Sequence, residues 1–113
     1  MLPEGNRLQR ERDFSHLWRR GREIRTQGLR IRSVKTSNTK PRVGIVVSKK
    51  ISKLATKRNR IRRVIKEALR PIIPSLRGER DYLIIVTPQF KEIPPKKLSA
   101  QLITLLHHHR FLK

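Results

Sequence analysis

The sequence predicts an α+β fold built as a single small domain. Stretches with hydrophobic residues at helical spacing alternate with short runs of Val, Ile and Leu, and Pro, Gly or polar residues separate them. The chain of 113 residues has the length of one domain, and no repeat or low-complexity linker divides it. We therefore expect one domain over residues 1–113, with residues 1–6 flexible and residues 109–113 frayed.

The first half should contain a helix and two strands. A helix is expected over residues 11–20, where three hydrophobic residues recur at helical spacing before Gly21: Phe14, Leu17 and Trp18. Residues 29–35 alternate as a strand does, and residues 43–48 have the pattern of a more buried strand. The polar turn TSNTKP between them suggests that these two strands form a hairpin.

The second half should contain a helix, a strand and a last helix. Thr56 is a plausible N-cap for a helix that ends near Arg70, because Pro71 and Pro74 discourage continuation. Residues 81–87 (DYLIIVT) indicate a buried strand. After Pro94 and Pro95, one helical face carries four leucines: Leu98, Leu102, Leu105 and Leu106. The predicted order is helix, strand, strand, helix, strand, helix, a two-layer α/β sandwich with one small sheet.

The charge of the chain points to a polyanionic partner. There are 29 Lys and Arg against 8 Asp and Glu, a formal net charge of +21. Such a basic surface is the electrostatic footprint of nucleic-acid binding. A membrane partner is not expected, because no apolar run approaches the ~20 residues of a span and the N-terminus lacks the apolar region of a signal peptide. Zero Cys excludes disulfides and thiolate chemistry and fits a reducing cytoplasm.

One short stretch concentrates this charge: KKISKLATKRNRIRRVIKEALR, residues 49–70, with Glu67 as its only acid. At helical spacing its apolar residues fall on one side, so the cations cover the other side. Arginine forks can grip phosphates, and the start of a helix also favours phosphate. The candidate RNA-binding residues are Lys49, Lys50, Lys53, Lys57, Arg58, Asn59, Arg60, Arg62, Arg63, Lys66 and Arg70.

This stretch, with VGIVVSKK shortly before it, resembles the RNR motif region of the bacterial ribonuclease P protein family. Residues 7–21 (RLQRERDFSHLWRRG) resemble the family's first helix, and DYLIIVTP resembles its last strand. The resemblance covers about residues 7–108. It implies a subunit that binds a catalytic RNA and helps it remove the 5′ leader of precursor tRNA by hydrolysis. It also implies a mixed sheet with a left-handed crossover, where strand statistics alone would favour a right-handed one.

The resemblance further implies a cleft for the single-stranded leader, between the first helix and the exposed sheet face. The residues mapped to it are Phe14, Trp18, Arg30, Arg32, Val46 and Ser48. Arg30 and Arg32 replace apolar or aromatic residues of the family and should lie opposite Leu29 and Ile31, where guanidinium planes would take over base stacking. An aromatic pair at this spacing can also be plain core, although the resemblance favours partial exposure.

No catalytic or metal-ligating residues are expected on the protein. Glu79 and Asp81 are the only close pair of acids, and they lie beside Arg77 and Arg80, where ion pairing is the simpler explanation. His107, His108 and His109 are adjacent on a helix and cannot all face one ion. We expect Mg²⁺ to be bound mainly by the partner RNA, with precursor tRNA as the second partner and no protein partner required. The alternatives are a structural RNA-binding protein, such as a small ribosomal protein, and a nuclease that acts without RNA, for which His16 is the remaining candidate.

Overall fold

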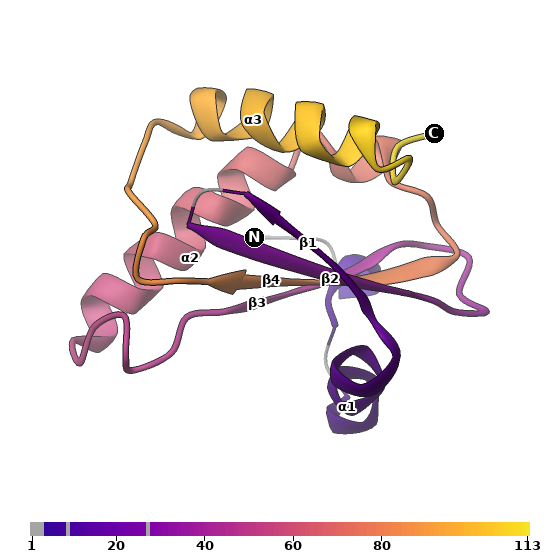
Figure 1. The fold of residues 1–113 in the computed structure, drawn as a ribbon, viewed down its shortest axis with the longest axis horizontal. Coiled ribbons are helices and arrows are strands. Elements are labelled where there is room, and N and C mark those ends of the chain that lie inside the picture. Colours follow the sequence, from indigo (N-terminus) through magenta and orange to yellow (C-terminus); the bar gives the residue numbers. More distant parts are fainter. Residues whose placement is uncertain (1–3, 9, 27) are drawn as a thin grey trace.

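The computed structural model describes residues 4–8, 10–26 and 28–113 and confirms the α+β class (Figure 1). Its helices and strands are α1 (Glu11–Arg20), β1 (Arg22–Thr26), β2 (Leu29–Lys35), β3 (Arg42–Val46), α2 (Ala55–Leu69), β4 (Arg80–Val86) and α3 (Pro95–His108). Two short 3₁₀ turns are η1 (Glu4–Asn6) and η2 (Ile73–Ser75). Every predicted helix and strand is present, and β1 is additional.

The four strands form a mixed sheet in the order β1-β2-β4-β3. β2 is antiparallel to both β1 and β4, whereas β3 is parallel to β4. The predicted hairpin of β2 with β3 is therefore wrong, because β4 lies between them. β4 is the most apolar strand and buries both of its faces, as central strands do, with Ile84 opposite Ile31 on one side and Ile45 on the other.

The true hairpin joins β2 to β1, the strand that sequence analysis missed. Its sequence REIRT has one apolar residue, Ile24, which is buried. Gly28, before β2, has a φ of +84°, and a Cβ there would lie 2.4 Å from the Phe90 Cα. Only glycine fits this position without strain.

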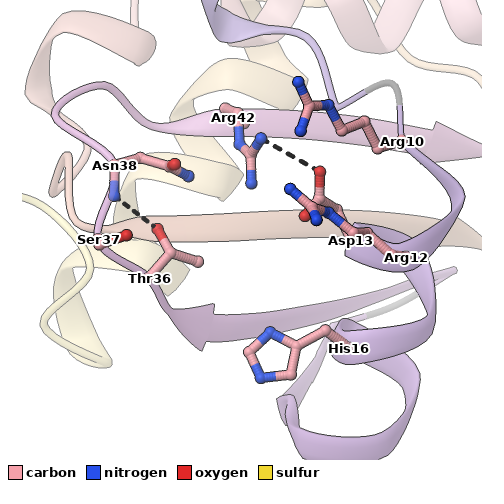
Figure 2. Close-up of a pocket in the computed structure, with 8 residues that line it drawn as sticks. All are labelled: Arg10, Arg12, Asp13, His16, Thr36, Ser37, Asn38 and Arg42. Carbon is pink, nitrogen blue, oxygen red and sulfur yellow. Dashed lines mark hydrogen bonds and ion pairs between the residues drawn. The ribbon is translucent and has the colours of Figure 1, made fainter.

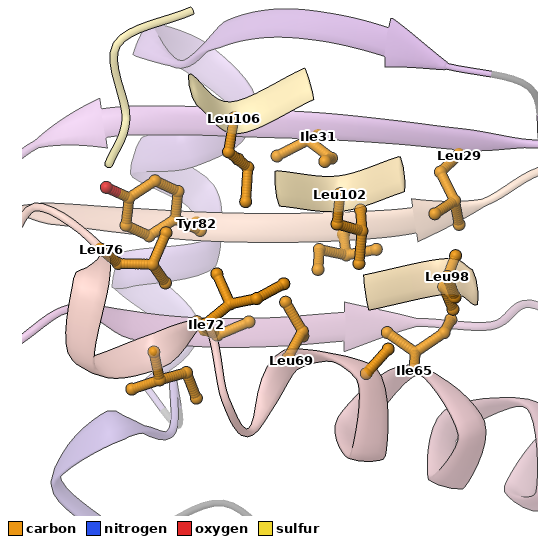
Figure 3. Packing of buried hydrophobic residues seen from close by; sticks show 14 of the residues in the cluster. Leu29, Ile31, Ile65, Leu69, Ile72, Leu76, Tyr82, Leu98, Leu102 and Leu106 are labelled. Atoms are coloured by element: carbon orange, nitrogen blue, oxygen red, sulfur yellow. The ribbon is translucent and has the colours of Figure 1, made fainter. Parts of the chain in front are cut away.

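The main core lies between one sheet face and the pair α2 and α3 (Figure 3). The sheet contributes Leu29, Ile31, Tyr82 and Ile84, and the helices contribute Ile61, Ile65, Leu69, Leu98, Leu102 and Leu106. Each such side chain stabilises the fold by ~1.5–3 kcal/mol relative to exposure. The apolar faces predicted for both helices are confirmed, with Leu105 only partly buried at the edge.

Helix α1 packs on the opposite face of the sheet, so the sheet lies between α1 on one side and α2 with α3 on the other (Figure 1). Leu17 is fully buried there against Leu83 and Ile85, and Gly21 ends the helix as predicted by donating its N–H to the Leu17 carbonyl. Gly44 of β3 allows close approach, because a Cβ there would meet Phe14 Cε1 at 2.9 Å.

Both ends of the chain make contacts where they are described. Residues 1–3 of the N-terminal segment expected to be flexible lie outside the described residues, whereas Asn6 Nδ2 donates to the Pro41 carbonyl at 2.7 Å. At the other end, where fraying is expected, Phe111 is buried in the main core and Leu112 bridges Leu76. In the described part of the chain, no helix is long and apolar enough to cross a membrane.

Candidate nucleic-acid interface

Helix α2 turns its cationic side away from the core, as predicted. Its buried residues are Ile61, Ile65, Ala68 and Leu69. Lys57, Asn59, Arg60 and Arg63 are exposed, as is Arg70 at the C-cap, whereas Arg58, Arg62 and Lys66 are half-buried. Thr56 is not the N-cap, because the helix already begins at Ala55 and Leu54 occupies the cap position without a side-chain hydrogen bond.

Two of these arginines hold the preceding loop, residues 47–54, against the helix. Arg58 Nη1 donates to the Ser52 carbonyl at 2.9 Å. Arg62 Nη1 donates to Asn59 Oδ1 at 2.8 Å, and its Nη2 reaches the Val47 carbonyl at 3.5 Å. The loop lysines Lys49, Lys50 and Lys53 are exposed and are thereby presented beside the first turn of α2.

Acidic residues neutralise only a small part of this surface. Arg60 pairs with Glu92 at 3.1 Å and Arg70 with Glu67 at 3.3 Å, and all four side chains are about a third exposed or more, so these pairs are weak. No ion pair within 4.0 Å is found for Lys57, Arg63 or Lys66 among the described residues. The outer side of α2 with its loop is therefore a cationic surface with spare donors, which suits phosphates.

On the opposite sheet face, the predicted aromatic pair is only partly buried. Phe14 is half-buried over Gly44, whereas Trp18 is 45% exposed. A large exposed aromatic ring beside cations offers a stacking surface for an unpaired base.

Arg30 and Arg32 point to the sheet face opposite to that of Leu29 and Ile31, as predicted. Glu23 of strand β1, which was not predicted, binds both arginines. Glu23 Oε1 accepts from Arg30 at 2.7 Å and from Arg32 at 3.3 Å. These contacts, the Arg30 hydrogen bond above all, lower the pKa of Glu23 to about 2. Strand β1 would have been suggested by the isolated Ile24 and the Gly28 turn.

Arg32 also closes the C-terminal end of α1. Its guanidinium donates to three carbonyls, those of Leu17 at 3.0 Å, Trp18 at 2.9 Å and Gly21 at 2.9 Å. The group lies 5.6 Å from the centre of the Trp18 ring. The Arg32 guanidinium therefore already has partners within the protein. It positions the Trp18 ring and is not a free plane for base stacking.

Strand β3 connects the two surfaces. Val46, half-buried beside Ile85, ends the strand on the α1 face, and exposed Ser48 follows at the start of the lysine-rich loop. Val46 therefore lies on the sheet face that carries Phe14 and Trp18, and Ser48 lies beside the cationic surface of α2 and its loop.

A hollow of about 550 Å³ lies at the N-terminal end of α1, and none of the six predicted cleft residues lines it (Figure 2). Its lining residues are Arg10, Arg12, Asp13, His16, Thr36, Ser37, Asn38 and Arg42. Arg42 grips the buried Asp81 at 2.8 and 2.7 Å and also lies 3.2 Å from Asp13. The hydrogen bonds to Asp81 raise the pKa of Arg42 above its usual value.

This arrangement corrects the expected pairing of the two neighbouring acids. Asp81 is bound by Arg42 and Asn38, not by Arg77 or Arg80, because its side chain points to the α1 face of the sheet. Glu79 makes no ion pair within the described residues. In the same part of the chain, no three His, Asp or Glu side chains gather as metal ligands.

A sequence model of the ribonuclease P family matches residues 2–110. The chain belongs to the ribonuclease P protein family. A protein named ribonuclease P protein component from Pseudanabaena sp. is 37% identical over 99 residues, covering 82% of this chain and 85% of the relative. A protein of the same name from Chlamydia trachomatis is 37% identical over 105 residues, covering 90% and 83%.

Solved ribonuclease P proteins share the fold. The Staphylococcus aureus protein superposes with a TM-score of 0.81 at 21% identity, covering 96% of this chain and 98% of the other. The Thermotoga maritima protein gives 0.77 at 24% identity, covering 90% and 96%. A β3-α2-β4 crossover of the opposite hand would carry α2 to the other sheet face and prevent such a superposition. The crossover in this chain therefore has the same hand as in these solved proteins.

Proposed function

We propose that this chain is the protein subunit of ribonuclease P and binds the enzyme's catalytic RNA through the outer side of α2 and the loop before it. Family membership and the unneutralised cations of α2 support this proposal together. Arg58 and Arg62 hold the loop in place, so the loop lysines and Lys57, Arg63 and Lys66 supply the phosphate contacts.

The second surface is proposed to hold the single-stranded 5′ leader of precursor tRNA. Trp18 offers a base-stacking ring, and Phe14 lies one helical turn before it, over Gly44. Val46 and Ser48 lead from this face toward α2. The Arg30 charge is largely offset by Glu23, so the leader is held by stacking more than by the charges of β2.

Catalysis is assigned to the RNA partner. We propose that Mg²⁺ is coordinated mainly by the catalytic RNA and that the protein screens phosphate repulsion and positions the leader, in the cytoplasm where tRNA is processed. The two acids best placed to act together, Asp13 and Asp81, are both bound to Arg42. An arginine at this distance competes with a metal ion for the carboxylates.

The experiment that tests this function compares the RNA-free protein with the reconstituted complex. Purified protein with millimolar Mg²⁺ should leave precursor tRNA intact, and addition of the catalytic RNA should give cleavage at the mature 5′ end at lower Mg²⁺ than the RNA needs alone. Cleavage by the RNA-free protein, or no effect of the protein on the RNA's Mg²⁺ requirement, would contradict the proposal. If sequencing of RNA copurified with the protein finds ribosomal RNA instead, the chain is a structural RNA-binding protein.

A further inference from the structure

A second cationic cluster lies at the other end of the sheet from the loop of α2. Arg22 at the start of β1 and Arg80 at the start of β4 line a hollow of about 570 Å³ together with Arg77, His108, His109, Arg110 and Phe111. The loop before α2 follows the C-terminal end of β3, whereas Arg80 lies at the N-terminal end of β4. Because β3 and β4 are parallel, these two strand ends lie at opposite ends of the sheet. In Figure 1 the C-terminus and the start of α2 lie at opposite sides of the molecule.

Three of the four guanidinium groups of this cluster, those of Arg22, Arg77 and Arg80, are held in place by uncharged partners. Arg22 and Arg80 both contact the Phe111 ring, at 5.4 and 5.0 Å from its centre. Arg80 Nε donates to the buried Ser33 hydroxyl at 2.8 Å. Arg77 Nε donates to the Arg110 carbonyl at 2.7 Å. These bonds leave the outer N–H groups of the arginines available.

Arg110 adopts an unusual backbone conformation that makes this arrangement possible. Its φ is +62°, the only positive φ of a non-glycine residue in the described part of the chain. A positive φ costs free energy in any residue other than glycine, and it persists only where surrounding contacts hold it. Here it follows the end of α3 and turns the carbonyl toward Arg77, while Phe111 enters the core.

The cluster has no acidic partner within the described residues. Arg25, Arg30, Arg32, Arg42, Arg60 and Arg70 each pair with an acid, whereas Arg22, Arg77, Arg80 and Arg110 do not. Of the acids adjacent to these arginines in sequence, Glu23 and Asp81 pair with other arginines. Glu79 lines a neighbouring hollow with Arg77 and Arg80 but forms no ion pair within the described residues. Like charges brought together without a counterion repel, and a bound anion would relieve that repulsion.

We propose that this cluster, formed by Arg22, Arg77, Arg80 and Arg110, is a second RNA-binding site that grips the phosphate backbone of a paired RNA segment. The inference rests on the proposed function and adds a contact separate from α2. Guanidinium groups bind phosphates without reading sequence. Base stacking is not expected, because the Phe111 ring is 3% exposed beneath Arg22 and Arg80 and the His108 and His109 rings pack edge to face on each other. A rigid backbone therefore suits the site better than an unpaired strand.

The first test measures binding of the catalytic RNA as a function of salt. The double variant Arg22→Gln and Arg110→Asn removes two charges, and Asn tolerates the positive φ. The slope of log affinity against log salt should fall in magnitude by up to about one for each lost phosphate contact. The matched control is Lys96→Gln and Lys97→Gln, which also removes two exposed charges, from the first turn of α3.

The outcomes separate this site from the proposed function. Equal losses in the cluster variant and the α3 control would show only the effect of net charge and would overturn the second site. A loss in an α2 variant such as Arg63→Gln, with none in the cluster variant, would overturn the second site and leave the function standing. If neither variant weakens binding, both proposals fail.

The second test does not depend on removing an interaction. Because the chain has no Cys, a single cysteine can carry an iron chelate that cleaves nearby RNA. We expect His108→Cys, at the cluster, to direct cleavage into a paired segment different from that reached by Lys53→Cys beside α2. The cleaved segment should belong to the catalytic RNA, both in its complex with the protein and in the holoenzyme bound to mature tRNA, because the first test measures binding of that RNA. Absence of cleavage from position 108 in both complexes would overturn the proposal.

Discussion

The guanidinium of Arg32 lies 5.6 Å from the centre of the Trp18 ring and donates a hydrogen bond to the Trp18 carbonyl at 2.9 Å. One arginine thus closes the C-terminal end of α1 and supports the ring that the end of this helix exposes. The contact joins the stability of α1 to the proposed leader site, because the same group serves both.

Replacing Trp18 should separate leader binding from binding of the tRNA body. Stacking on an aromatic ring is worth ~1–3 kcal/mol per base, so Trp18→Ala should weaken holoenzyme binding to precursor tRNA about 5-fold to 150-fold. Binding to leaderless tRNA should hardly change, and Trp18→Phe should keep most of the affinity. Equal losses for both RNAs, with a clearly lower melting temperature, would mean that Trp18 is a structural residue.

Removing Arg32 should destabilise the fold more than removing Arg25. Arg32→Ala removes the guanidinium donor of the Trp18 and Gly21 carbonyls, and a hydrogen bond from a charged group is worth ~1.5–3 kcal/mol. The Arg25 side chain is 71% exposed and pairs with the same Glu23, so Arg25→Ala should cost under about 1 kcal/mol. Urea unfolding of both variants measures the difference, and equal costs would contradict the assigned role of Arg32.

The Glu23 carboxylate should give a stability contribution that disappears in acid. Its pKa falls from 4.5 to about 2 on folding, so the charged form is favoured in the folded state. The contribution is complete above about pH 4.5 and is lost as the pH falls toward 2. Glu23→Gln should therefore unfold more readily than the parent chain at pH 7, and the two unfolding free energies should converge near pH 2. A gap that does not depend on pH would contradict the ion-pair origin.

Breaking the bond between Arg42 and Asp81 should be more damaging than breaking either exposed pair on α2. The Asp81 side chain is 1% exposed, so Arg42→Ala leaves a buried carboxylate with Asn38 as its remaining partner. Removing one partner of a buried pair typically costs 3–5 kcal/mol. Glu92→Gln, which removes the exposed partner of Arg60, is the control and should have little effect. A similar loss in both variants, measured by thermal unfolding, would contradict this ranking.

Local pattern was enough to predict the helices and three strands, but not how the strands pair. Phe14, Leu17 and Trp18 recur at a period that only a helix satisfies, and β4 has the unbroken apolar run of a central strand. Strand β1 has only Ile24 and the Gly28 turn as its signals, and the pairing of β2 with β4 joins residues far apart in sequence. Nothing local indicates such a partner.

The candidate site shows the same limit. The exposed face of α2 follows from the spacing of its apolar residues. The bonds of Arg58 to Ser52 and of Arg32 to the end of α1 depend on the path of the chain in space. Sequence therefore identified where the cations lie, and the structure shows which of them already have partners within the protein.

Binding of the catalytic RNA by α2 variants tests the central claim most directly. Lys57→Gln with Arg63→Gln removes two exposed charges that have no ion pair within the described residues, and Lys96→Gln with Lys97→Gln on α3 is the control of equal charge. In filter binding over a range of salt, the account predicts weaker binding and a slope lower by up to about two for the α2 variant, with a smaller change for the control. Unchanged affinity and slope in a folded α2 variant would contradict it.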